Sequence, residues 1–454
     1  MDNTTYETER TMVLRKLRLT LHTGRLLMES MADTSRIERN MMRMADHLGL
    51  PTEKMHIFTD FHKLGLSLDT EDNNPITLFC PGERKGVNMA VINDVSHLSF
   101  KAIDEEYTVE RCEEELKLIE SRKRSYSPLL TVLGGGAACG GFCFLFGSDF
   151  IGAVYASLAA MMGLRLRQML HARKLNGYFV TCVVTFFSTL IAWMLALLSQ
   201  QAAVSANLPD FLSSQTPWHP LMACTLFIIP GIPLINFVSD MLSGHTLVGI
   251  GRAVITLLTV LSMAFGIAFA IKVCGIDNFV HDLSMTPHHS YLGYSLGAAT
   301  AAVGFSMLFN TPPRLLPIVA LGGIVAVCTR NFVNLDASTG NIGLGLGPVL
   351  GSFVGSALVS LLCTRVVRLL NTPHHCISIP SVIPMVPGVL MYRALFAFID
   401  MNGVVGEVTY AMFNAINASL IILFIAVGVA IPNIFFPRMM DGLPNIINKV
   451  RRKW

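Results

Sequence analysis

Apolar runs dominate the chain after residue 127. Ten of them come close to the roughly 20 residues that a helix needs to cross a bilayer. Because lipid offers no hydrogen-bond partner to the backbone, a run of this kind must be a helix or be buried in protein. The predicted spans are 128–147, 150–169, 177–198, 219–241, 249–271, 291–310, 315–329, 342–364, 379–399 and 408–432. We therefore predict an all-α polytopic membrane protein with ten transmembrane helices.

Charged residues are concentrated at the start of the chain. They make up only 14% of all residues, against about 25% in a typical soluble domain. We predict a cytoplasmic domain over 1–127, five-helix membrane units over 128–275 and 286–436, and a basic cytoplasmic tail over 437–454.

The positions of Lys and Arg predict how these spans are oriented. If residues 1–127 are cytoplasmic, thirteen Lys and Arg residues of the later loops and tail are cytoplasmic as well. The outside loops then carry two, Lys272 and Arg330. Since cytoplasmic loops are enriched in basic residues, we predict a multi-pass protein of a bacterial plasma membrane. Both termini are predicted to be cytoplasmic.

Two spans are interrupted in the same way. The stretch FIIPGIPLINFVSD (227–240) carries Pro230 and Gly231, and SVIPMVPGVLMYRALFAFID (381–400) carries Pro387 and Gly388. Each is the fourth span of its group of five, and an odd number of spans turns the second group over in the membrane. Paired Pro/Gly interruptions at matching positions mark the substrate site of many inverted-repeat transporters. We predict such a repeat, although proline kinks used only for packing stay open as the alternative.

Polar residues near the two breaks are the candidate functional groups. We assign substrate binding to Pro230, Gly231, Asn236, Pro387, Gly388 and Arg393. Arg393 stands out because an arginine inside a membrane span costs about 3 kcal/mol unless it faces a cavity or a partner. The candidates for proton coupling are Asp240, Asp400, Glu407 and Asp149. Low-dielectric surroundings favour the protonated form of a carboxyl group, but each of the four could instead be a solvated interfacial carboxylate.

The N-terminal domain has its own periodicity. Residues 12–50 show the spacing of two amphipathic helices, and Ser35 and Glu38 are spaced as a capping box for the second. Short β-like runs follow at 55–61, 76–80 and 87–93, and a further helix is predicted over 105–124. This pattern indicates a small α+β domain.

Small residues recur at four-residue intervals in several spans, which predicts close contact between helix backbones. The repeats are Gly136 and Gly140, then Gly293, Gly297 and Ala301, and finally Gly343, Gly347, Gly351 and Gly355.

Two segments of the N-terminal domain carry a family resemblance. GRLLMESMADTSRIERNMMRMADHLGL (24–50) resembles the opening of the threonine/serine exporter family, and VNMAVINDVSHLSFKAID (87–104) is similar to its second block. The resemblance covers roughly residues 15–435. Glu29, Arg36 and Glu38 match the family motif, whereas Met31 stands where the family usually has glycine. The resemblance implies export of small amino acids such as threonine and serine, or of small dicarboxylates such as succinate.

These observations predict a secondary exporter of threonine and serine, driven by the proton motive force, with its substrate between the fourth and ninth spans. The alternatives are a dicarboxylate exporter, and a membrane-anchored enzyme or sensor that acts through its N-terminal domain. The sequence lacks the motifs GxxxxGK[ST], HExxH and GxSxG, which argues against ATP-driven pumping and against hydrolase chemistry. We expect no enzyme activity, no cofactor, no metal and no nucleic-acid partner. The expected partners are a small solute and the lipid bilayer, and a homo-oligomer stays open.

Overall fold

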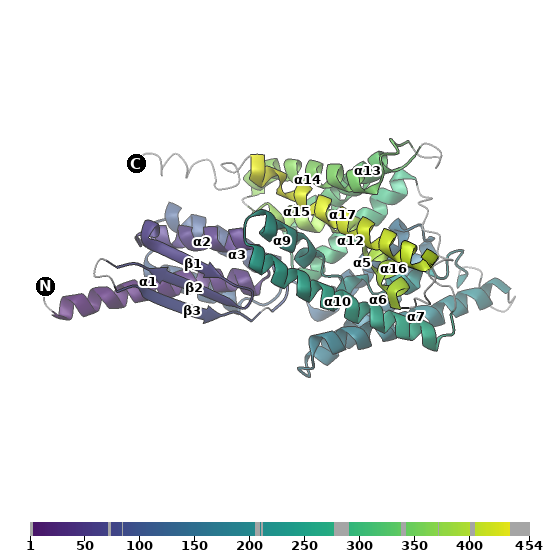
Figure 1. Ribbon diagram of the computed structural model, residues 1–454, viewed down its shortest axis with the longest axis horizontal. Helices are drawn as coiled ribbons and strands as arrows, with labels where there is room; N and C mark the ends of the chain where they lie inside the picture. The colour runs from purple at the N-terminus through teal and green to yellow at the C-terminus, as the bar shows by residue number, and fades with distance from the viewer. Residues whose placement is uncertain are drawn as a thin grey trace.

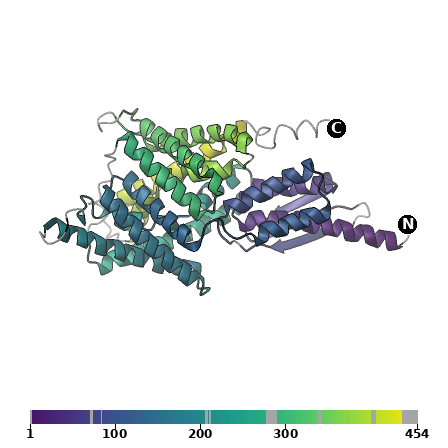
Figure 2. The same cartoon turned by 180° about the vertical axis from the view of Figure 1, so that it is seen from behind.

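The structure is a computed structural model that describes residues 3–70, 74–83, 85–204, 209, 212–276, 290–336, 342–370, 372–399 and 405–435. A small domain of helices and strands lies at one end of the molecule, and a bundle of helices forms the rest (Figure 1). The view from behind shows the same division (Figure 2).

The small domain has four helices and a three-stranded antiparallel sheet in the order β1-β2-β3. The helices are α1 (Asn3–Glu29), α2 (Thr34–His47), α3 (Met89–Asp104) and α4 (Val109–Ser121). The strands are β1 (Met55–Thr59), β2 (Lys63–Leu68) and β3 (Ile76–Pro81), and a single turn of 3₁₀ helix, η1 (Thr52–Lys54), precedes them. Leu64 and Leu66 of the central strand are fully buried, so the sheet and the helices share one core.

Two details of this domain correct the sequence analysis. The predicted strand at 87–93 is the start of helix α3, because Asn88 caps that helix and accepts a hydrogen bond from the Val91 N–H. The strand β2 was not predicted. Its Gly65 pairs with Phe58 and Phe79, and a Cβ there would lie 2.5 Å from the Phe79 ring.

The start of α2 also differs from the prediction. The residue that caps this helix is Asp33, whose carboxylate accepts from the Arg36 N–H, and not Ser35. Glu38 does not complete a capping box, because its carboxylate accepts a hydrogen bond from the Thr59 hydroxyl and lies 3.6 Å from His245 Nε2.

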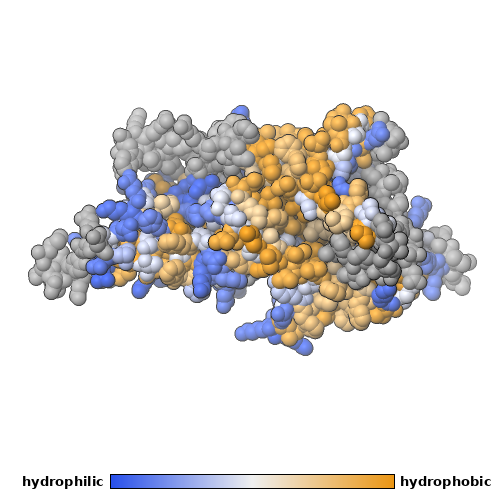
Figure 3. All heavy atoms as spheres, in the orientation of Figure 1, coloured by the Kyte–Doolittle hydropathy of each residue, from blue (hydrophilic) through white to orange (hydrophobic). Residues whose placement is uncertain are grey.

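The bundle consists of long apolar helices. They are α5 (Pro128–Leu145), α6 (Phe150–His171), α7 (Gly177–Val204), α10 (Thr246–Val273), α12 (Tyr291–Leu308), α13 (Leu316–Asn334, preceded by η4, Pro313–Leu315), α14 (Pro348–Leu370) and α17 (Val405–Phe435). Within the described ranges, seven helices are long and apolar enough to cross a membrane, or eight if one bent pair counts as a span. Apolar side chains cover the face of the bundle seen in Figure 3, whereas polar ones gather on the small domain. The chain is therefore a multi-pass membrane protein, and the ten-span inverted repeat stays a prediction.

Both proline stretches interrupt helices, as predicted. The first consists of α8 (His219–Ala223), η3 (Leu226–Ile228) and α9 (Gly231–Leu242), and the two helical parts meet at an angle of 58°. The second consists of α15 (His375–Val382), η6 (Ile383–Met385) and α16 (Gly388–Ile399). Pro230 and Pro387 each stand immediately before the helix that follows the break, where the missing N–H of a proline costs no helical hydrogen bond.

Helix contacts in the first group recur in the second. Helix α5 packs on α6, α7 on α10, and α9 on α10. In the same way α12 packs on α13, α14 on α17, and α16 on α17. The two groups meet through α5 and α12, and through the pairs α9 with α17 and α10 with α16.

Glycines allow the two groups to meet closely. A Cβ at Gly304 of α12 would lie 2.4 Å from the Gly134 carbonyl oxygen and 2.5 Å from the Ala138 nitrogen of α5. The predicted close contact of Gly351 and Gly355 is also present, against the backbone of α13. However, α14 begins at Pro348, so Gly343 and Gly347 precede the helix, and Gly347 has a positive φ of 88°.

The α5–α12 contact predicts how two glycine variants differ. Gly304→Ala should lower the free energy of unfolding by about 1–3 kcal/mol, because its methyl group would push two backbones apart. Gly406→Ala is the matched control, since a Cβ there meets nothing within 4 Å and alanine favours the helix by up to about 1 kcal/mol. Thermal unfolding in detergent measures both, and equal melting temperatures for the two variants would contradict this packing.

Candidate functional site

The two breaks lie against each other in the interior of the bundle. A Cβ at Gly231 would be 2.6 Å from Ile383 Cδ1, and one at Gly388 would be 2.4 Å from Ile229 Cδ1. Each break thus presents a glycine to an isoleucine of the other. Backbone that lacks helical partners is tolerated at membrane depth only when it is buried in protein or lines a cavity, and this arrangement meets that condition.

A cavity of about 640 Å³ lies beside the first break. One wall is the break itself, from Phe227 to Pro233. The other walls come from helices α5, α6, α10 and α12 and from the N-terminal domain. Their residues are Thr131, Leu164, Arg167, Gln168, His171, Arg252, Ile255, Thr256, Thr259, Leu308, Phe309, Met31, Phe61, Lys85, Gly86, Val87 and Arg124. Its volume is in the range of small-molecule sites.

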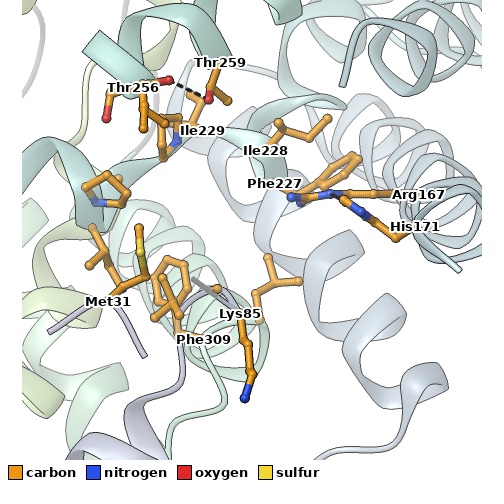
Figure 4. A pocket seen from close by; sticks show the side chains of 18 of the residues that line it. Met31, Lys85, Arg167, His171, Phe227, Ile228, Ile229, Thr256, Thr259 and Phe309 are labelled. Carbon is orange, nitrogen blue, oxygen red and sulfur yellow. Dashed lines mark hydrogen bonds between the residues drawn. The ribbon is translucent and has the colours of Figure 1, made fainter. Parts of the chain in front are cut away.

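Basic side chains dominate the polar lining. Arg167 and His171 extend from α6 toward Phe227 at the break (Figure 4), with 3.4 Å between Arg167 Nε and His171 Nε2. Arg124 comes from the connector before α5, and its guanidinium donates to the Val87 carbonyl over 3.0 Å. Lys85 pairs with Glu29 at 2.9 Å.

The charges in this lining do not balance. Lys85 and Arg252 have carboxylate partners, Glu29 and Asp240. Arg124 and Arg167 have none within the part of the chain that the structure describes, and no Asp or Glu is among the lining residues. Because guanidinium groups form their strongest hydrogen bonds with anions such as carboxylates, the cavity is suited to an anionic group.

Two threonines of α10 add neutral polar groups. The Thr259 hydroxyl donates to the Ile255 carbonyl over 2.8 Å, the interaction drawn dashed in Figure 4. The Thr256 hydroxyl is buried and has no hydrogen-bond partner among the described residues. A buried hydroxyl of this kind is a ready partner for a solute atom.

The structure brings only some of the predicted binding residues to this cavity. Pro230 and Gly231 line it. Asn236 lies further along α9, and its amide donates to the Met31 carbonyl of the N-terminal domain over 2.9 Å. The lining residues do not include Pro387, Gly388 or Arg393, and Arg393 is half-buried in α16.

The four predicted proton-coupling residues lie in different surroundings. Asp240 is buried, pairs with Arg252 at 2.7 Å and accepts from the Thr34 N–H at 2.9 Å. Asp400 and the side chain of Glu407 lie outside the described residues. Asp149 caps α6.

Hydrogen bonds give Asp149 a structural explanation. Burial disfavours its charge, but the hydroxyls and N–H groups that donate to it hold its pKa below the usual range. The donors are the Gly152 and Gln215 N–H groups and the Ser214 and Thr216 hydroxyls. Asp149 therefore fastens the α5–α6 loop to residues 214–216.

Sequence analysis missed Arg124, Arg167 and His171 as candidate ligands. Arg167 is one of the thirteen basic residues that predict the orientation of the spans. Helix α6 continues to His171, so Arg167 and His171 lie one turn apart on the same face. This i, i+4 spacing was the available signal, but the sequence could not show that the connector would bring Arg124 to the same cavity.

Comparisons with known proteins cover most of the chain. Residues 18–274 match the family profile described as "Putative threonine/serine exporter", and residues 294–435 match "Threonine/Serine exporter, ThrE". The "Threonine/serine exporter" of Corynebacterium glutamicum is 20% identical and covers 91% of this chain and 82% of its own length. The "Probable succinate transporter subunit YjjP" of Escherichia coli K12 is 27% identical and covers 58% of this chain and 96% of its own length.

No solved structure gives a significant match. The first of the two profiles alone spans more than half of the sequence. This chain belongs to the threonine/serine exporter family.

Proposed function

We propose that this protein is a secondary exporter of small carboxylates and that the solute binds in the cavity beside the first break. The observation that carries the proposal is the pair Arg124 and Arg167, which face a solute-sized cavity without a carboxylate partner among the described residues. A carboxylate in this cavity would receive charge-assisted hydrogen bonds from one or both guanidinium groups.

Dicarboxylates such as succinate are the substrates that this lining favours. A zwitterionic amino acid also carries an ammonium group, and the lining residues include no carboxylate to pair with it. The E. coli relative named "Probable succinate transporter subunit YjjP" is in line with this assignment.

Threonine and serine are the second candidate. The relative from Corynebacterium glutamicum is named "Threonine/serine exporter". The unpaired Thr256 hydroxyl offers an acceptor for an ammonium or hydroxyl group, and it is the feature of the cavity that favours these substrates.

The matching helix contacts of the two groups support an inverted five-plus-five repeat. By these contacts α9 corresponds to α16, and α10 corresponds to α17. A twofold axis between the groups would therefore turn the contact of α9 with α17 into the contact of α16 with α10, and both contacts are present. The cavity lies toward the N-terminal domain, which contributes part of its wall. With that domain in the cytoplasm, as the distribution of basic residues predicts, an exported solute would load from this side.

For coupling to protons we propose Asp240. Its carboxylate is 1% exposed and pairs with Arg252, which is 2% exposed and lines the cavity. Protonation of Asp240 would release Arg252 from its only carboxylate among the described residues, so that proton binding and solute binding would draw on the same guanidinium.

Replacing Arg167 tests the binding proposal. Arg167→Gln removes the charge but keeps a polar side chain, so counterflow of labelled succinate in proteoliposomes should fall about 10- to 100-fold, as expected for the loss of a charge-assisted hydrogen bond. The matched control is Arg173→Gln in the exposed loop after α6, which should transport like the parent protein. Parental rates in Arg167→Gln would exclude this cavity as the binding site.

The same proteoliposomes test which substrate the protein carries. Succinate should exchange faster than threonine or serine, and Thr256→Val should slow threonine and serine more than succinate. A protein that exchanges threonine or serine but not succinate would reverse the order of the two candidates.

A paired substitution tests the coupling proposal. Asp240→Asn should cost about 3–5 kcal/mol of stability, because it leaves the Arg252 charge buried without its partner. Asp240→Asn combined with Arg252→Gln should recover most of this loss, which thermal unfolding measures. We expect the double variant to retain solute counterflow at a reduced rate but to show no export driven by a pH gradient. Export that still follows the pH gradient would remove Asp240 from the coupling mechanism.

A further inference from the structure

Residues 31–34, which comprise the end of the connection between α1 and α2 and the first residue of α2, form one of the contacts between the N-terminal domain and the membrane bundle. We call these residues the docking turn. Met31 has a positive φ of 68°, a left-handed conformation that side chains with a Cβ disfavour. Such a conformation persists only where surrounding contacts hold it.

Three hydrogen bonds join the docking turn to the first helix group. The Asn236 amide of α9 donates to the Met31 carbonyl over 2.9 Å, and Arg252 Nη2 of α10 donates to the Ala32 carbonyl over 2.6 Å. In the other direction, the Thr34 N–H donates to the Asp240 carboxylate over 2.9 Å. The turn therefore supplies partners to both members of the buried Asp240–Arg252 pair, which a buried ion pair needs to offset its loss of hydration.

Asp33 of the docking turn and Arg36 of α2 connect the turn to the second helix group. Asp33 accepts from Arg36 at its backbone N–H and at Nε, at 3.0 and 3.1 Å. Arg36 Nη2 lies 2.7 Å from Nδ1 of His375, the first residue of α15. Burial opposes the charge of Asp33, but the Arg36 guanidinium holds the pKa of Asp33 well below its usual range. Asp33 is thus ionised and keeps Arg36 directed at the second broken helix.

A second contact ties the domain to the bundle at the start of α3. The Met89 and Ala90 N–H groups donate to the carbonyls of Phe309 and Asn310 after α12, at 2.9 and 3.0 Å. The domain also forms part of the cavity wall through Met31, Phe61 and residues 85–87. Met31, Lys85 and Phe309 are seen together on one side of the cavity in Figure 4.

We propose that the N-terminal domain is the gate of the cavity on its own side, and that the docking turn leaves the first helix group in every transport cycle. Alternating access moves one repeat against the other around the site. The docking turn and Arg36 bind both groups through short contacts, so both sets of contacts cannot persist when the groups move apart. The inference rests on the proposed function, because it assumes this movement.

A reversible tether tests the proposal. Glu38 of α2 and His245 before α10 are both partly exposed, and 3.6 Å separates their charged groups. Cysteines at these two positions, joined by a short bifunctional thiol reagent that can be cleaved by reduction, would hold α2 against α10 without touching the buried pair. The half-buried Cys80, Cys182, Cys274 and Cys328 are replaced by serine in this background.

The tethered protein should lose at least tenfold of its succinate counterflow, and reduction should restore the rate. The two single-cysteine proteins, treated with the same reagent, are the controls and should keep their rates. Full transport by the tethered protein would overturn the gate. If the parent protein, with none of these substitutions, moved no solute of any kind, the proposed function itself would fail.

Hydrogen exchange gives a test that needs no transport. Asn236→Ala removes the donor to the Met31 carbonyl, so the amides of residues 31–36 should exchange at least tenfold faster while those of β2 keep the parental rate. Asn417→Ala is the matched control, since the Asn417 amide donates to Phe413 within its own helix, α17. Unchanged protection of residues 31–36, or equal loss of protection across the whole domain, would contradict a docking turn that opens by itself.

Discussion

The structure depends on the contact between two interrupted helices inside an apolar bundle. A helix that stops at a proline in lipid leaves backbone groups without partners, and lipid cannot supply them. The protein solves this by placing the two breaks against each other, with Gly231 facing Ile383 and Gly388 facing Ile229. Because a side chain at either glycine would separate the breaks, the contact fixes how the two helix groups meet. The cavity beside the first break follows from the same arrangement.

The pairing of charged residues differs between the cavity and the docking turn. On the cavity side, Arg124 and Arg167 face open space without a carboxylate partner among the described residues. At the docking turn, Asp240 and Arg252 are paired at 2.7 Å and receive further partners from residues 32 and 34. Buried charges such as those of Asp240 and Arg252 are costly unless they are fully paired. Arg252 both lines the cavity and donates to the Ala32 carbonyl of the docking turn. In our proposal, this residue links the occupancy of the cavity to the docking of the domain.

Much of the fold could be predicted from the sequence, because apolar length and proline position act locally. The two breaks at Pro230 and Pro387 and most helix bounds followed from these signals. Local signals failed where a residue serves a distant partner. The run 87–93 has β-like composition but is a helix capped by Asn88, and Asp33 rather than Ser35 begins α2. The strand β2 was not predicted, because its Gly65 makes room for Phe79 of the neighbouring strand and so depends on a distant residue.

The site was harder to predict than the fold for the same reason. Pro230 and Gly231 line the cavity, but Asn236 and Asp240 of the same helix turn to the N-terminal domain. The cavity carries the charges of Arg124 and Arg167, which are 43 residues apart in the sequence. They line the same cavity because the connector before α5 places Arg124 there. No periodicity in the sequence encodes such a meeting.

The most direct measurement of the central claim is an electron cryomicroscopy map of the full chain in lipid nanodiscs with succinate present. We predict density for the solute beside Pro230, within hydrogen-bond distance of the Arg167 guanidinium. Solute density bound elsewhere, or breaks that separate and face the acyl chains of the lipid, would contradict the account.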